Sequence, residues 1–124
     1  VVGALIYSAF VRDVNYMEAL AYQRYIPETT ILQEEAFSEM LDIYNRAKDK
    51  GYSESSVLYI QKDDKSIYEI NKIVSPMLRA TDYIGLRPDG GLAILLTNTN
   101  EKEAVHVIDR LSMAKIKTYL SYSI

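Results

Sequence analysis

The order in which apolar runs and capped helical segments follow one another restricts the fold of this chain more than any other feature. Short apolar runs typical of buried β-strands occupy residues 56–61, 83–86, 92–96 and 116–122 of the 124-residue sequence. Two helix-periodic segments separate them, and each begins at a capping box, Ser66 with Glu69 and Asn100 with Glu103. This β-α-β-β-α-β order predicts an α+β fold, in which an antiparallel sheet carries its two crossover helices on one face.

The two middle runs are predicted to form a β-hairpin. The segment between them is Arg87-Pro88-Asp89-Gly90-Gly91, and proline, aspartate and glycine are the residues that tight turns favour. A connection of this length and composition favours antiparallel pairing of the runs on either side of it.

The first part of the chain has a helical pattern. Apolar residues recur near a 3.6-residue period over residues 1–26, and Pro27 is expected to end that helix. We therefore predict a connecting helix over residues 1–27 and one compact domain over residues 28–124. A simpler alternative is that the segment is the first packed helix of the domain.

A second helix is predicted to follow directly. Thr30 and Gln33 have the spacing of a capping box, and Gly51 suits the residue just past the C-terminus of a helix. The next predicted helix, after Ser66, carries Pro76 near its end, which predicts a kink or a tightened last turn.

Composition excludes several classes of function. The formal net charge is −3, so the chain lacks the basic surface of a DNA- or RNA-binding protein. It contains no cysteine and one histidine, which rules out thiolate metal sites and disfavours histidine-rich ones. Apolar residues make up 48% of the chain, enough for a packed core.

One stretch resembles a known family. Arg79-Ala80-Thr81-Asp82 forms an R-x-x-D motif, and five residues separate it from the turn that begins at Pro88. An apolar strand, a polar turn and a capped helix follow. This register resembles the second half of a GGDEF (diguanylate cyclase) domain. The resemblance implies a nucleotide cyclase-like fold with a ferredoxin-like βαββαβ core.

The family's catalytic signature is absent. Pro88 and Asp89 stand where the family has two glycines, and Gly90 and Gly91 stand where it has two acidic residues. Those carboxylates hold Mg²⁺ in an active cyclase, and glycine has no side chain to do so. Gln61 stands near the family's other metal carboxylate. The resemblance therefore implies a degenerate GGDEF domain that is not an enzyme and needs no magnesium or other cofactor.

The resemblance assigns the R-x-x-D motif to binding of cyclic di-GMP. An arginine fork can pair with N7 and O6 of guanine, and a carboxylate can accept from its N1–H and N2–H groups. Arg79 and Asp82 are the expected contacts, with Arg110 in the last helix as a third. In the assumed fold that helix packs beside the Arg79 helix, so the two arginines are expected to converge.

Other interpretations of these residues remain open. Arg79 and Asp82 could form only a surface ion pair, as residues three apart often do. The domain could be a scaffold for protein–protein interaction that binds no nucleotide. A residual nucleotide enzyme would have to use Asp63, Asp64 and Asp89.

The pattern of lost and retained residues resembles the PelD-type cyclic di-GMP receptors of Pel exopolysaccharide systems. The implied function is regulation of exopolysaccharide biosynthesis or export by a non-enzymatic receptor domain. The implied partners are cyclic di-GMP, an upstream GAF-like domain and the proteins of a Pel-type membrane complex, and a homodimer is left open. The implied location is the cytoplasmic side of a protein associated with the inner membrane.

Overall fold

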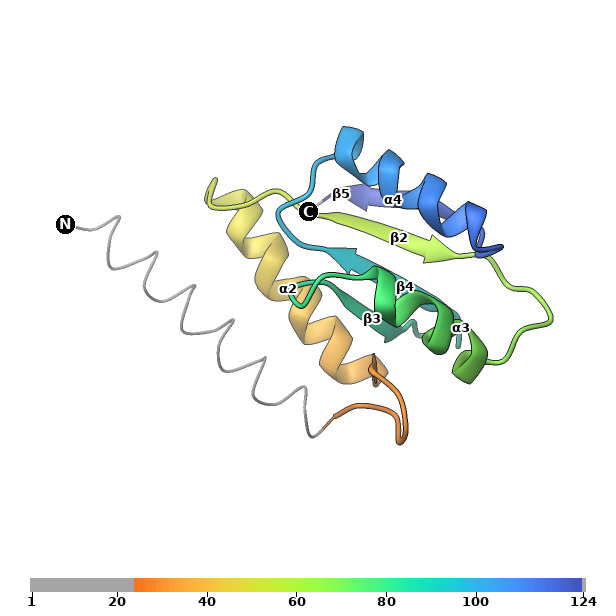
Figure 1. Cartoon of the computed structure of the whole chain (residues 1–124). Helices are drawn as coiled ribbons and strands as arrows, with labels where there is room; N and C mark the ends of the chain where they lie inside the picture. The colour runs from red at the N-terminus through yellow and green to blue at the C-terminus, as the bar shows by residue number, and fades with distance from the viewer. Residues whose placement is uncertain (1–23, 124) are drawn as a thin grey trace.

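The computed structural model describes residues 24–123 and has the element order of an α+β fold. Figure 1 shows the elements along the chain. They are β1 (Ile31–Leu32), α2 (Glu34–Asp49), β2 (Ser56–Ile60), α3 (Ile67–Val74), the 3₁₀ turn η1 (Ser75–Met77), β3 (Tyr83–Leu86), β4 (Leu92–Leu96), α4 (Glu101–Met113) and β5 (Thr118–Ser123).

One sheet contains all of the strands, in the order β1-β3-β4-β2-β5. The four predicted strands are β2, β3, β4 and β5, and their mutual pairings are all antiparallel. Their order is compatible with a ferredoxin-like α+β core. The predicted sheet was incomplete, because β1 adds a fifth strand that runs parallel to β3 and makes the sheet mixed.

Helices cover both faces of the sheet. The crossover helices α3 and α4 lie on one face, as the element order predicts, and α2 lies on the other (Figure 1). Side chains therefore alternate along each strand between two separate clusters. In β4, for example, Ala93 and Leu95 pack toward α2, whereas Leu92, Ile94 and Leu96 pack toward α3 and α4.

The predicted start of the second helix was wrong. Ile31 and Leu32 form β1 rather than a first helical turn, and both are fully buried, one in each core cluster. The helix begins instead at Glu34, and its N-cap Gln33 makes no side-chain capping bond. Burial of two large apolar side chains against β3 outweighs the local capping pattern that Thr30 and Gln33 offer.

The C-terminus of α2 is as predicted. Gly51 has a φ of 75°, and its N–H bonds to Lys48 O at 2.9 Å. Tyr52 N–H bonds to Ala47 O at 2.8 Å, which completes a Schellman motif.

The first predicted helix falls mainly outside the described residues, since residues 1–23 are not described. Its expected extension to Ile26 is wrong. Tyr25 forms a β-bridge with Leu32, and Ile26 N–H bonds to Ile31 O at 2.8 Å. Residues 24–26 are therefore held extended against the start of the domain. Within residues 24–123, no helix is long and apolar enough to cross a membrane.

The other helix boundaries follow the sequence. Ser66 Oγ accepts a bond from Glu69 N–H, and Asn100 and Glu103 form a complete reciprocal capping box. Pro76 lies in η1, so the proline tightens the end of α3 into a 3₁₀ turn, as its position predicts.

Gly85 allows α2 to lie close to the sheet. A Cβ at this position would come within 2.6 Å of three atoms of the Phe37 side chain. The Phe37 ring therefore occupies the space above the glycine, which fixes the spacing between α2 and β3.

Candidate functional site

The R-x-x-D motif forms the tight connection between η1 and β3. Leu78 has an extended backbone that ends the helical turn, and Asp82 N–H bonds to Arg79 O at 3.0 Å. The four residues therefore form one turn, and Asp82 lies directly before the first residue of β3. This geometry brings the two side chains of the motif together, as the sequence predicts.

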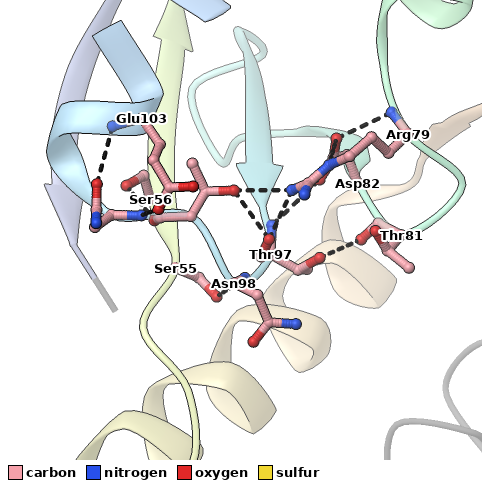
Figure 2. Close-up of polar contacts among 10 residues, drawn as sticks. Ser55, Ser56, Arg79, Thr81, Asp82, Thr97, Asn98 and Glu103 are labelled. Atoms are coloured by element: carbon pink, nitrogen blue, oxygen red, sulfur yellow. Dashed lines mark hydrogen bonds and ion pairs between the residues drawn. The ribbon is translucent and has the colours of Figure 1, made fainter. Parts of the chain in front are cut away.

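Arg79 and Asp82 form a side-on bidentate ion pair (Figure 2). Arg79 Nε donates to Asp82 Oδ2 at 3.0 Å, and Arg79 Nη2 donates to Asp82 Oδ1 at 2.8 Å. The backbone N–H of Arg79 also donates to Oδ2, at 3.0 Å. The hydrogen bonds from Asp82 raise the pKa of the Arg79 guanidinium above its already high ordinary value.

The two partners differ sharply in exposure. The Asp82 side chain is 4% exposed, whereas the Arg79 side chain is 56% exposed. Thr97 N–H also donates to Asp82 Oδ1, at 3.3 Å. The carboxylate is therefore turned inward and fully engaged, and the guanidinium is the part of the motif that solvent reaches.

The turn between β4 and α4 holds the guanidinium in place. Arg79 Nη2 donates to Thr97 O at 2.7 Å and to Thr99 Oγ1 at 2.8 Å. Thr97 Oγ1 donates back to Thr81 O at 2.8 Å, so the two turns are tied together in both directions (Figure 2). These bonds use both hydrogens of Nη2. The Nη1 group has no hydrogen-bond partner among the described residues.

The start of β2 supports the same turn. Ser56 Oγ donates to Thr99 O at 2.8 Å, and Ser55 Oγ accepts from Asn98 N–H at 3.2 Å (Figure 2). Both serines are fully buried. Asn98 has a φ of 51°, a conformation that asparagine tolerates better than most residues. The polar turn after β4 was predicted, but its role as a mount for Arg79 was not.

A small hollow adjoins the pair. It has a volume of about 200 Å³ and lies between the motif, β3 and the segment before β1, with Tyr25, Thr30, Arg79, Asp82 and Tyr83 in its lining. Pockets for drug-sized ligands measure roughly 300–1,000 Å³. The hollow has room for one base of a dinucleotide and not for the whole.

Arg110 does not join this cluster, contrary to the predicted convergence. It lies exposed in the last turn of α4, whereas Thr99, which contacts Arg79, directly precedes the N-cap Asn100. Ten residues of helix separate Asn100 from Arg110, which is about 15 Å along the axis. Packing of α4 beside α3 leaves the two arginines at different ends of the layer.

The positions of the absent signature have structural roles in the hairpin. Gly90 has a φ of 85°, and its N–H bonds to Arg87 O at 3.0 Å to close the turn. Asp89 Oδ1 accepts from Gly91 N–H at 2.9 Å. Gln61 directly follows β2, and its N–H bonds to Lys117 O at 2.8 Å.

The remaining carboxylates do not form a metal-binding group. Asp63 pairs with Lys65 at 2.8 Å, and Asp89 pairs with Arg87 at 2.9 Å. In the part of the chain that the structure describes, no three acidic or histidine side chains gather as ligands would.

Comparison with known proteins adds no relative. A scan of the sequence against protein-family models finds no match, and a search for similar curated proteins finds none either.

Proposed function

We propose that this domain is a non-enzymatic receptor for cyclic di-GMP, a degenerate member of the GGDEF family that contacts the ligand through Arg79. The observation that carries the proposal is the exposed guanidinium on a rigid mount. Asp82, Thr97 and Thr99 hold one edge of the group, while the side chain as a whole is 56% exposed and lines a hollow of base size.

The geometry supports different proposed roles for the two residues of the motif. Bidentate recognition of guanine N7 and O6 takes two N–H groups on one edge of the fork. Nη1 supplies one, and Nη2 supplies the other only by leaving Thr97 and Thr99. Asp82 keeps its bonds from the backbone N–H groups of Arg79 and Thr97, and its pairing with the guanidinium, while Nη2 exchanges Thr97 and Thr99 for the ligand. Arg79 is the contact, and Asp82 is the positioning residue.

The hairpin supports the proposal that the domain is not an enzyme. Gly90 and Gly91 have no ligating side chain at the positions where the family binds magnesium, and Gln61 is neutral. We therefore propose that binding is the output of the domain. By the same resemblance, the output acts on a Pel-type exopolysaccharide complex at the membrane, with an upstream GAF-like domain as neighbour.

Isothermal titration calorimetry with cyclic di-GMP tests the proposal. We expect Arg79→Ala to weaken binding roughly 5- to 150-fold, the range that one bidentate base contact supplies. Arg79→Lys keeps the charge and loses the fork, so it should fall close to Arg79→Ala. Arg46→Ala is the matched control, because Arg46 is an exposed arginine in the last turn of α2. Thermal melts of each variant establish that it folds.

Absence of heat with the wild-type chain at high micromolar ligand would reject the proposal, as would an unchanged affinity in Arg79→Ala. Arg110→Ala adds a separate test of the predicted third contact. A loss of affinity in this variant, with an unchanged thermal melt, would support Arg110 as a contact, and an unchanged affinity would reject that contact.

A second candidate is a scaffold domain that binds no nucleotide. The observation in its favour is that the fold itself uses Arg79, since the Nε–Nη2 edge is already paired with Asp82 and the β4–α4 turn. In that case Arg79→Ala lowers stability, no nucleotide binds, and capture of a membrane partner survives the substitution. Incubation of the protein with GTP and Mg²⁺ tests for residual cyclase activity. Formation of a cyclic product would contradict both candidates.

A further inference from the structure

A second hollow, of about 220 Å³, opens on the α2 face of the sheet at the hairpin end of β3. It lies between the first turns of α2 and the β3–β4 turn, on the face opposite to α3 and α4. Its lining includes the apolar residues Phe37, Leu41, Val57 and Ala93, of which Phe37, Val57 and Ala93 are buried.

The sequence explains why space is left here. One row across the sheet on the α2 face contains Gly85, Ala93, Tyr59 and Tyr119, in the order β3, β4, β2, β5. The two small residues are neighbours, so side chains extend only a short distance from the sheet at β3 and β4 and much farther at the tyrosines of β2 and β5. Phe37 fills the space above Gly85. The hollow reaches down to Ala93, which is itself buried.

The rim contains a fixed cation and aromatic rings. The Arg87 guanidinium carbon lies 3.6 Å above the centre of the Tyr59 ring, and Arg87 Nη2 is held by Asp89 at 2.9 Å. Tyr59 meets the rings of Tyr119 and Tyr122 edge to face, with centroid distances of 5.8 and 6.4 Å.

A β-bulge brings the last of these rings to the rim. The register between β2 and β5 shifts so that Val57 pairs with Tyr122 and Leu58 with Leu120, which leaves Ser121 unpaired. Without the extra residue, Tyr122 would point to the opposite face of the sheet. The bulge therefore adds an aromatic side to the hollow.

Size and chemistry together restrict the ligand. An apolar cavity of about 150 Å³ accepts benzene, so this hollow has room for one ring or two fused rings. Aromatic edges and a guanidinium plane interact with the π-face of a ring and gain nothing comparable from an aliphatic group. Glu34 and the tyrosine hydroxyls at the rim offer hydrogen bonds to a polar edge.

From this geometry we infer that the hollow is a binding site for a planar heteroaromatic small molecule of one or two rings, held beside Arg87 and Tyr59 above the buried Ala93. The site is independent of the proposed cyclic di-GMP contact. Arg79 lies before β3 and this hollow lies at its other end, and the two hollows share no lining residue.

NMR titration of the whole chain with indole, adenine and cyclohexanol tests the inference. We expect indole and adenine to shift the amide signals of Phe37, Tyr59 and Ala93, with a dissociation constant on the order of 0.1–1 mM for ligands of this size. Cyclohexanol, a non-planar ring, should leave these signals unchanged. The signals of Thr97 and Thr99, beside Arg79, should not move with any of the three.

Two variants and a control identify the site. Arg87→Gln removes the stacked cation and should weaken indole binding about two- to fivefold. Ala93→Leu fills the floor and should abolish binding, provided a thermal melt shows that it folds. Arg46→Gln removes an exposed arginine from the other end of α2 and should change nothing.

Four results would overturn the inference: no shift at millimolar indole, equal shifts with cyclohexanol, shifts confined to other parts of the chain, or an unchanged affinity in Arg87→Gln. The last result does not depend on whether Ala93→Leu folds.

Discussion

The two ends of β3 carry arginine–aspartate pairs that have opposite burial. At the first end, the Asp82 side chain is 4% exposed and the Arg79 side chain is 56% exposed. At the second end, the Arg87 side chain is 23% exposed and the Asp89 side chain is 56% exposed. The same two residue types therefore present a cation at one end of the strand and an anion at the other.

Backbone geometry accounts for the difference. Asp82 lies directly before β3, where its carboxylate reaches the N–H groups of Arg79 and Thr97. Asp89 lies in the hairpin turn. Among the backbone N–H groups of other described residues, only that of Gly91 donates to its carboxylate. Its partner Arg87 lies over the Tyr59 ring. An arginine and an aspartate that are close in sequence therefore do not indicate which of the two charges is exposed. The backbone donors around the carboxylate decide it.

The largest expected contrast is between Asp82→Ala and Asp89→Ala. Asp82→Ala removes the carboxylate that accepts the hydrogen bond from Thr97 N–H. Thr97 is 1% exposed, so its N–H is left without water as a replacement. Each buried donor left unsatisfied costs about 1–3 kcal/mol, so the free energy of unfolding should fall by at least that amount. Asp89→Ala should change it far less, because this carboxylate is exposed to water.

Urea denaturation of both variants measures the contrast. Equal losses of stability would mean that burial of the carboxylate does not distinguish the two turns. Asp82→Asn is a useful intermediate, because it keeps an acceptor for Thr97 N–H while it removes the charge that pairs with Arg79.

A smaller effect is expected at the second end, from the contact of Arg87 with Tyr59. A cation over an aromatic face contributes about 0.5–1 kcal/mol at a partly exposed site. A double-mutant cycle with Arg87→Ala and Tyr59→Leu should give a coupling energy of that size. The same cycle with Arg79→Ala in place of Arg87→Ala should be additive, since Arg79 does not contact Tyr59. Additivity in both cycles would show that the stacking geometry contributes no stability.

Much of the fold follows from local patterns that the structure retains. The strands β2 to β5, the capped starts of α3 and α4 and the hairpin turn are all where periodicity and turn residues predict them. Each is determined by residues close together in the sequence. The strand β1 is different, because only Ile31 and Leu32 form it and their pairing partner β3 lies some fifty residues later. A two-residue run carries no period, and its capping pattern favoured the wrong element.

The candidate site divides in the same way. The contact between Arg79 and Asp82 was predictable because residues three apart in a turn lie side by side. The inward orientation of Asp82 was not, because it depends on the Thr97 N–H from the turn after β4. The expected convergence of Arg110 with Arg79 was wrong for a related reason: the position of Arg110 along α4 sets its distance from Arg79, and a shared layer of helices does not make two residues neighbours. Its contact with the ligand stays a prediction.

The smallest expected effect is the change in stability as Asp89, at the hairpin end of β3, is protonated at acid pH. The hydrogen bond from Gly91 N–H, followed by the charges of Arg87 and Lys62, lowers the pKa of Asp89. A lowered folded-state pKa adds stability above the ordinary aspartate value of about 3.9, and that contribution is lost as the pH falls through the folded value. The turn should therefore loosen only below about pH 4.

The Gly91 amide signal, followed by NMR from neutral to acid pH, reports this titration directly. Its midpoint should lie below the ordinary aspartate value, and Arg87→Gln should move it upward, because the variant removes one of the stabilising charges. A midpoint at or above the ordinary value would mean that the exposed carboxylate gains nothing from its turn. Asp89 would then be a solvated surface charge, and Arg87 would depend on Tyr59 alone for its position at the rim of the aromatic hollow.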